Sequence, residues 1–345
     1  MKISLIVPVS RLDRFRECLD SLKRQDVASD SFEVVAVSTQ DLSPLSDQQG
    51  DFGLILLRAD RNHPSAMRNM AVQASHGDIL AFIDDDTTLP SHWVGEIARI
   101  LTENPERIIG GPNVDRRPQF AIALANAVQE HPLLEGLNNH RSQPQAVIAV
   151  NAHNIPLSNA AMTRAVFARV GSFNEVANYF MDGSEFLYIA GRLGIPTFLY
   201  GSLEIQHDNR PAFLPYLRYK WRARHKIGGN YILFPECYAH AMPVKLVLLS
   251  FLGLVGMLAA LAVTGGLLTI LPWAAAAWLA VLYAAGWRDL RRPRIFALTA
   301  PVVFVTQALM YCGFLAGLFQ GMLTVGRHLD VIEHKAVRYR VFIEA

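Results

Sequence analysis

The sequence predicts an α/β domain with a mostly parallel sheet, followed by C-terminal transmembrane helices. Two observations support this architecture. Over residues 1–110, apolar runs of strand length alternate with segments in which apolar residues recur at helical spacing, a pattern that favours parallel strands with helices on both faces. Farther along the chain, two long runs contain no charged residue and no histidine, and a membrane span needs only about 20 mostly apolar residues.

Residues 1–110 contain short apolar runs that we interpret as strands. These runs cover residues 2–9, 32–38, 54–59 and 78–84. The first strand is followed by a helix whose apolar face is formed by Leu12, Phe15, Leu19 and Leu22. Further helices are expected from Ser65 to Gly77 and over 91–104, with Ser65 and Ser91 as their N-caps.

Residues 111–210 are less regular. We expect strands over 145–150 and over 196–207, the second of which ends in His207. Helices that end at a glycine are expected over 163–171 and 184–194. No G-x-G-x-x-G follows the first strand, so the dinucleotide-binding fingerprint is absent from this position.

The two charge-free runs extend from Leu246 to Trp287 and from Ile295 to Gly326. They predict a transmembrane region over 244–326 with roughly two to four membrane segments, three being favoured. The loop between the runs, RDLRRPR, is expected in the cytoplasm by the positive-inside rule. The polar tail over 327–345 is also basic, so the pattern leaves open whether the last run crosses the bilayer or re-enters it.

The remaining composition is consistent with a cytoplasmic N-terminal domain. A net charge of +2 gives no reason to expect a nucleic acid partner. The N-terminus lacks the apolar run and cleavage site of a signal peptide. Cys18, Cys237 and Cys312 form neither a metal spacing nor a disulfide framework, which suits a reducing compartment. We therefore expect a multi-pass protein of the inner (cytoplasmic) membrane.

An amphipathic, basic segment over 211–243 precedes the charge-free runs. On a helix, an apolar and a basic face would be formed by Leu214, Leu217 and Trp221 and by Arg218, Arg222 and Lys226. Such a helix is suited to lying at a membrane surface. Two roles stay open for Arg222, Arg224 and Lys226: they clamp a diphosphate or lipid phosphate, or they attract the anionic leaflet.

Three adjacent carboxylates, Asp84, Asp85 and Asp86, follow directly on an expected strand. Ligands of open α/β sheets bind beyond the carboxyl ends of the strands. Hard cations such as Mg²⁺ prefer oxygen ligands, and a cation would relieve the repulsion between the carboxylates. On these residues alone, a metal site and a solvated acidic turn before the helix over 91–104 are equally open.

The N-terminal pattern resembles the family 2 glycosyltransferases, inverting enzymes of the GT-A fold that use nucleotide-diphosphate sugars. The matching pieces occur in order, namely LIVPVS, FEVVAVS, RADRNHPSAMRNMAVQASHGDILAFIDDDTTLP, IGGPN, SNAAMTRAVFARVGSFNE and SEFLYIAGRLG. The later LRYKWRARHKIGGN and the apolar runs look like the membrane-anchored subset that acts on polysaccharide or lipid-linked acceptors. The resemblance thus implies a GT-A domain over 1–210.

The same resemblance implies a metal site. Asp84 and Asp86 match the family's D-x-D element, and His207 matches its downstream metal-site histidine. Asp86 would bind Mg²⁺ or Mn²⁺, while Asp84 would bind the ribose or sugar and also approach the metal. Such a metal stabilises the charge that develops on the leaving nucleotide.

The resemblance also points to a catalytic base and to donor-binding residues. Asp182 is the expected base and Glu185, one helical turn away, is the alternative; either residue would otherwise cap the helix. The family's second acid is replaced by Gly183. The donor-binding residues implied are Pro8, Ser10, Ser38, Arg68, Asp84 and Asp85, and Asp85 would alternatively only orient Arg68 or the turn. Ser38 and Thr39 replace the family's Asp pair, which leaves UDP, GDP and dTDP open.

These observations predict a membrane-bound inverting glycosyltransferase. It would move a sugar from a nucleotide-diphosphate donor to a lipid-linked or polymeric glycan at the cytoplasmic face, alone, as a homo-oligomer or in a biosynthetic complex. Two alternatives remain. One is a catalytically silent sugar-binding or scaffold subunit of a polysaccharide assembly. The other is a transport protein, although the apolar runs lack the ionisable residues that an ion carrier usually needs.

Overall fold

The structure is a computed structural model of the chain. It describes residues 1–48, 50–115, 145–152, 155–175, 183–207, 213–238, 309–310 and 312–324. The chain divides into two compact units, each of which is described by itself. The first comprises Met1–Arg117, Leu133–Asn209 and Leu329–Ala345, and the second comprises Pro118–Pro132 and Arg210–His328.

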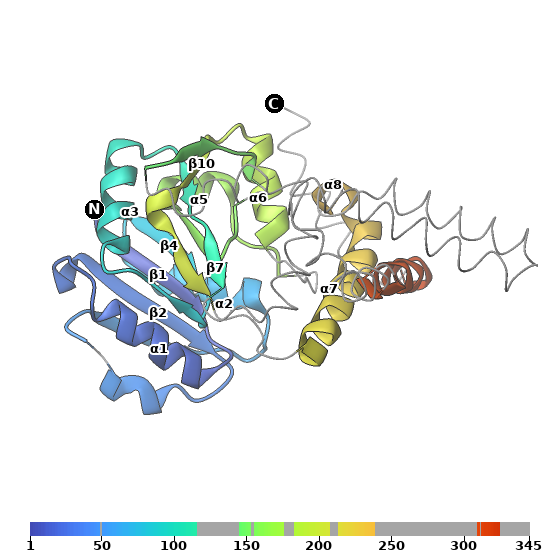
Figure 1. Cartoon of the computed structure of the whole chain (residues 1–345), viewed down its shortest axis with the longest axis horizontal. Coiled ribbons are helices and arrows are strands. Elements are labelled where there is room, and N and C mark those ends of the chain that lie inside the picture. Colours follow the sequence, from blue (N-terminus) through green and yellow to red (C-terminus); the bar gives the residue numbers. More distant parts are fainter. Residues whose placement is uncertain are drawn as a thin grey trace, which may run out of the picture. The chain divides into compact units, whose positions relative to one another are not determined.

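A central sheet organises the first unit (Figure 1). In the described residues its strand order is β3-β2-β1-β4-β9-β6-β10-β8. The bounds are β1 Ile3–Pro8, β2 Phe32–Ser38, β3 Gly53–Arg58, β4 Ile79–Ile83, β6 Ile108–Gly110, β8 Val147–Ala149, β9 Asn159–Thr163 and β10 Thr197–Tyr200. Strands β3, β2, β1 and β4 run parallel, β6 is parallel to β10, and β9 and β8 are antiparallel to their neighbours. The predicted mostly parallel sheet is confirmed.

Helices cover both faces of this sheet. On one face, α1 (Leu12–Leu22) and α3 (Trp93–Glu103) contribute Phe15, Leu19 and Trp93 to an apolar core with alternate residues of β1. The other face is covered by α2 (Pro64–Ala74), α5 (Arg164–Val170) and α6 (Gly183–Arg192). Because successive side chains of a strand point to opposite faces, a fully buried strand such as β2 contributes residues to both cores.

A second, smaller sheet joins three short strands of the first unit. These are β5 (Thr87–Thr88), β11 (Ile205–His207) and β7 (Asn113–Asp115), in the order β5-β11-β7. Strand β11 is antiparallel to β5 and parallel to β7. The continuous strand expected over 196–207 is therefore wrong: a short 3₁₀ turn at Gly201–Leu203 separates β10 from β11, and each strand joins a different sheet.

The expected helix N-caps are also wrong. Helix α2 begins at Pro64, and the ring Nδ1 of His63 accepts a hydrogen bond of 3.4 Å from the backbone of Ala66. Proline suits this first position because its missing N–H needs no partner there. Helix α3 begins after His92 rather than at Ser91. In contrast, the expected helix ends at Gly171 and Gly194 are confirmed, with φ +94° and +65° at these two glycines.

In the second unit, the described residues form α7 (Phe213–Leu233), α8 (Pro235–Tyr238) and a further helical stretch over 312–324. Glycines bring α7 and the stretch 312–324 into backbone contact. A Cβ on Gly228 or Gly317 would collide with the carbonyl oxygen of Phe314 or His225, respectively. On α7, Leu217 is buried but Leu214 and Trp221 are exposed, so the three residues do not form one buried face.

The predicted membrane segments fall mainly on residues that the structure does not describe. The run over 246–287 lies outside the described residues, as do the tail over 327–345 and most of the run over 295–326. Among the helices that are described, none combines the length and the apolar character that a bilayer crossing requires.

Candidate functional site

Strand pairing brings His207 to the acidic cluster. Asp84–Asp86 occupy the turn that connects the carboxyl end of β4 to β5. In the small sheet, His207 of β11 is paired in register with Thr87 of β5, the residue that directly follows Asp86. Residues far apart in the sequence therefore become neighbours through one backbone pairing, at the sheet edge where open α/β sheets bind ligands.

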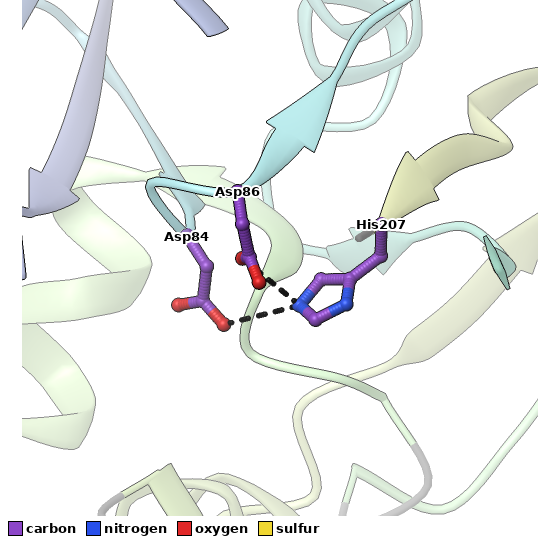
Figure 2. Close-up of side chains that lie close together, drawn as sticks. All are labelled: Asp84, Asp86 and His207. Carbon is purple, nitrogen blue, oxygen red and sulfur yellow. Dashed lines mark ion pairs between the residues drawn. The ribbon is translucent and has the colours of Figure 1, made fainter. Parts of the chain in front are cut away.

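The three side chains converge on one point. Figure 2 shows the carboxylates of Asp84 and Asp86 directed toward the same nitrogen of His207. His207 Nε2 lies 3.2 Å from Asp86 Oδ1 and 3.7 Å from Asp84 Oδ2. One ligand atom from each residue lies within 4.8 Å of the other two. The side chain of Asp86 is only 4% exposed, whereas those of His207 and Asp84 are 23% and 37% exposed.

This arrangement fits a divalent cation. Among the described residues, no hydrogen-bond donor satisfies Asp86 Oδ1, although this oxygen is buried. A buried polar atom without a partner is costly, so such an atom in a native site calls for a further ligand. Two carboxylates and one imidazole are donors that Mn²⁺ and Mg²⁺ accept. Asp86, Asp84 and His207 are therefore the residues that would hold the cation.

The pKa shifts in the cluster agree with this fit. Burial acts to raise the pKa of Asp84, but the His207 ring and the Arg68 guanidinium outweigh it, so this pKa lies below its ordinary value. For Asp86, burial outweighs the attraction of His207 and Arg11, and the pKa is raised. Burial acts to lower the pKa of His207, yet the neighbouring carboxylates raise it. The raised pKa of Asp86 means that its neighbours do not fully offset the cost of burying its negative charge. A bound cation would add the missing positive charge.

Asp85 holds the loop that follows β1. Its Oδ2 accepts hydrogen bonds from the Ser10 backbone (2.7 Å), the Ser10 hydroxyl (2.9 Å) and the Arg11 backbone (2.7 Å). Its Oδ1 accepts a further bond of 3.0 Å from Arg11 Nη2. Asp85 is 3% exposed, and this set of bonds compensates for the burial of its carboxylate. The bonds go to the loop after β1 and do not involve Arg68.

Arg11 belongs to the site but was missed from the sequence. Its guanidinium bridges Asp85 and Asp86, with Nη2 2.5 Å from Asp86 Oδ2. The only local signal is its place directly after Ser10, at the carboxyl end of β1. A single arginine after a strand resembles any solvated loop residue, so the pattern alone did not identify it.

Arg68 and Ser38 contact the surrounding frame. Arg68 extends from α2, is 6% exposed, and places Nη2 3.3 Å from Asp84 Oδ1. Ser38, at the end of β2, is fully buried and donates a 2.7 Å hydrogen bond to the carbonyl of Val9. Pro8 ends β1 and is partly buried. The structure thus uses the Ser38 hydroxyl to join the ends of β1 and β2, and its contact with a nucleotide stays a prediction.

The structure describes only part of the expected catalytic base and basic clamp. Asp182 lies outside the described residues. Glu185 lies in the first turn of α6 and is 2% exposed. Arg222, Arg224 and Lys226 lie on α7 and belong to the second compact unit. Their roles toward a donor or a membrane therefore stay predictions.

A comparison with known families identifies the domain. Residues 4–171 match the family model described as Glycosyl transferase family 2. This segment includes β1, the acidic cluster and α5. It ends before His207, so the family match and the geometric argument for the histidine are separate observations.

Individual relatives are distant. The chain is 26% identical over 187 residues to a glucosyl-dolichyl phosphate glucuronosyltransferase of Haloferax volcanii, covering 50% of this chain and 56% of that protein. It is 27% identical over 116 residues to a poly(ribitol-phosphate) β-N-acetylglucosaminyltransferase of Staphylococcus aureus, covering 32% of this chain and 20% of that protein. Each match therefore spans less than two thirds of the relative.

A solved structure supports the fold. A mannosyltransferase from Pyrobaculum calidifontis, solved in complex with GDP-Man and Mn²⁺, superposes with a TM-score of 0.56 at 19% identity, over 90% of this chain and 86% of that one. At this identity the likeness concerns the fold alone. Together with the family match, it shows that the chain carries a glycosyl transferase family 2 domain with the GT-A fold.

Proposed function

We propose that the protein is a membrane-bound, metal-dependent, inverting glycosyltransferase that uses a nucleotide-diphosphate sugar. The observation that carries the proposal is the convergence of Asp84, Asp86 and His207 at the carboxyl edge of the sheet in a family 2 domain. The Pyrobaculum calidifontis relative, solved with GDP-Man and Mn²⁺, supports a donor and a cation of this kind.

The residues of the cluster would divide the work at the donor. Asp86 and His207 hold the cation, which when bound supplies a Lewis acid for the leaving diphosphate. Asp84 is partly exposed and is directed to the same point, so it contacts the cation or the sugar. Arg68 is buried behind Asp84 and keeps that carboxylate ionised. The cluster therefore offers the donor a prearranged set of charges.

An inverting reaction requires a base for the acceptor hydroxyl. Asp182 is our proposed base, and Glu185 is the alternative on the next turn of the chain. The acceptor is a lipid-linked or polymeric glycan. The names of the relatives, which include glucosyl-dolichyl phosphate and poly(ribitol-phosphate), support acceptors of these two kinds.

Membrane attachment is proposed from the two charge-free runs. Of the large apolar side chains exposed in the described residues, most lie in the second unit, namely Leu214, Trp221, Phe319, Met322 and Leu323. Phe319, Met322 and Leu323 lie inside the second charge-free run, and exposed apolar residues there are typical of contact with lipid. We place the GT-A domain on the cytoplasmic side, where nucleotide sugars are made available to it.

The donor assignment can be tested on the full chain in detergent. Thermal unfolding is measured with UDP, GDP and dTDP sugars, each with and without Mn²⁺ or Mg²⁺. One nucleotide class should raise the melting temperature only with the cation, since a ligand that binds the native state stabilises it. Asp86→Asn should abolish this shift and lower donor turnover by about 10²- to 10³-fold.

Asp20→Asn is the matched control, because it removes an exposed carboxylate of α1 whose partner is Lys23. It should leave the shift and the turnover unchanged. A silent sugar-binding subunit, suggested by Gly183, Ser38 and Thr39, would show the cation-dependent shift without donor turnover. If no nucleotide sugar shifts the wild type with either cation, the proposed function is wrong.

A further inference from the structure

Arg11 is a positive charge placed where a cation is expected. Its Nη2 contacts Asp86 Oδ2 at 2.5 Å and Asp85 Oδ1 at 3.0 Å. The other oxygen of Asp86, Oδ1, faces His207 at 3.2 Å. The carboxylate of Asp86 is therefore shared between an arginine on one side and the candidate metal-binding atoms on the other.

The backbone of the loop that carries Arg11 is held in place by bonds that do not involve the Arg11 side chain. Asp85 Oδ2 receives both backbone N–H groups of Ser10 and Arg11 and the Ser10 hydroxyl. The guanidinium adds its own contacts, and the Arg11 side chain is 44% exposed. An exposed arginine on an anchored backbone can turn to a new partner while the loop keeps its position.

The balance of charge in the cluster makes the contact between Arg11 and Asp86 depend on whether a cation is bound. In the free site, the three carboxylates of Asp84, Asp85 and Asp86 outnumber the guanidinium groups of Arg11 and Arg68, and the His207 ring lies beside them. A divalent cation held by Asp86 reverses this balance and repels the nearby guanidinium. In the proposed function the donor diphosphate binds at the same edge, and a guanidinium matches phosphate oxygens through paired hydrogen bonds.

We propose that Arg11 exchanges partners during donor binding: it neutralises Asp86 in the free site and turns to the donor diphosphate once a divalent cation occupies Asp86. Arg11 thus opposes the binding of the cation alone and favours the binding of the nucleotide with the cation. This inference rests on the proposed metal and donor site, and it adds a residue that links the two ligands.

The two ligands give Arg11→Gln effects of opposite sign. Mn²⁺ alone is titrated into the detergent-solubilised full chain and followed by electron paramagnetic resonance. The Kd for Mn²⁺ should fall by about threefold to tenfold, because Asp86 no longer has a competing cation. At saturating Mn²⁺, calorimetric titration with GDP and with UDP should show a Kd raised by about 10-fold or more for the nucleotide that the wild type binds.

Two further variants serve as controls. Arg16→Gln removes an exposed arginine from α1, the helix that directly follows Arg11, and should leave both affinities unchanged, which excludes a general effect of net charge. Arg11→Lys keeps the charge but offers a single ammonium, so both Kd values should lie between those of wild type and Arg11→Gln.

The outcomes separate the inference from the proposed function. If the wild type binds Mn²⁺ and a nucleotide but Arg11→Gln and Arg11→Lys leave both affinities unchanged, or weaken both together, the exchange of partners is wrong and the proposed function stands. If the wild type binds neither Mn²⁺ nor either nucleotide, the proposed site is wrong and the exchange is wrong with it. Opposite shifts for the two ligands support the inference.

Discussion

At the end of β4, Asp84 faces Arg68, Asp85 faces the loop after β1, and Asp86 faces His207 and Arg11. Like charges on adjacent residues repel, and positive groups placed between the carboxylates offset this repulsion: His207 lies between Asp84 and Asp86, and Arg11 bridges Asp85 and Asp86. The pKa values of Asp84 and Asp86 move in opposite directions as a result. Asp84 and Asp86 are therefore expected to differ in how readily they bind a proton, although both are aspartates in one turn.

The position of Asp86 beside His207 was predictable at the residue scale, but that of Arg11 was not. The D-x-D spacing and a strand that ends in His207 are visible in the sequence. The orphaned Oδ1 of Asp86 and the bridge from Arg11 depend on how the loop after β1 folds onto the turn after β4. That contact joins residues more than seventy positions apart (86 − 11 = 75), and local periodicity carries no information about it.

Glu33 provides a prediction at the opposite end of the sheet. Burial acts to raise its pKa, but hydrogen bonds from the His76 backbone (2.5 Å) and Ser4 hydroxyl (2.7 Å), with the Lys2 ammonium, lower it to about 2. A lowered native-state pKa stabilises the fold fully above the ordinary value of 4.5, and this contribution is lost as the pH falls toward 2.

Glu33→Gln should therefore reduce the free energy of unfolding at neutral pH by about 1–3 kcal/mol. The deficit should shrink as the pH is lowered from 4.5 toward 2, because the wild-type carboxylate is then protonated as well. Denaturant unfolding at a series of pH values measures both effects. Glu106→Gln, whose carboxylate is exposed, is the control; an equal loss there would contradict the argument.

At the element scale, the longer strands of the central sheet were the most predictable. Strand β2 was expected over 32–38 and is Phe32–Ser38, because the valine-rich stretch over 34–37 fits a strand buried on both faces. Strands β5, β7 and β11 are two or three residues long, too short for a period to emerge. They exist because each pairs with the others, and pairing partners are not encoded locally.

The expected end of α2 at Gly77 is another instructive error. The helix stops at Ala74, and Gly77 instead serves a close approach of two backbones. A Cβ at this position would lie 2.5 Å from the Ser4 backbone nitrogen. Glycine in a sequence marks either a helix end or a close approach, and only the packing of β1 against the chain before β4 decides between them.

The glycine contact between α7 and the stretch 312–324 predicts sensitivity to added volume. Gly317→Ala places a methyl group against the backbone carbonyl of His225, which cannot move without shifting α7. We expect the melting temperature in detergent to fall, with a loss of about 1–3 kcal/mol.

Gly191→Ala is the matched control for this prediction. Its Cβ would meet Ala152 Cβ at 3.8 Å, an ordinary contact, and alanine favours the helix. This variant should be neutral or slightly stabilising. Equal behaviour of the two variants would mean that α7 and the stretch 312–324 do not contact one another through their backbones.

At the scale of the whole molecule, the chain combines a GT-A domain with a C-terminal part that is unusually apolar. The hydrophobic content of 51% is uneven, since two runs lack charge altogether. The basic residues of α7 precede these runs. A protein with this distribution should be held by apolar insertion, with the basic residues contributing about 1 kcal/mol each at an anionic surface.

Cell fractionation tests the proposed mode of membrane attachment directly. The full chain should remain in the membrane pellet after washing with high salt and with alkaline carbonate, because insertion does not depend on charge. The double variant Arg222→Gln, Lys226→Gln should behave in the same way. Release of the wild type by salt would assign the attachment to the basic face of α7, and recovery in the soluble fraction would contradict a membrane protein.

The pairing of β11 with β5 has a consequence for folding. Asp86 and His207 close a loop of about 120 residues (207 − 86 = 121), within which β6, β7, β8, β9, β10 and their helices form. Restricting a long loop removes more entropy from the unfolded chain than restricting a short one. A cation shared by these two residues would act as a cross-link, so its binding free energy would also stabilise the native arrangement of that whole segment.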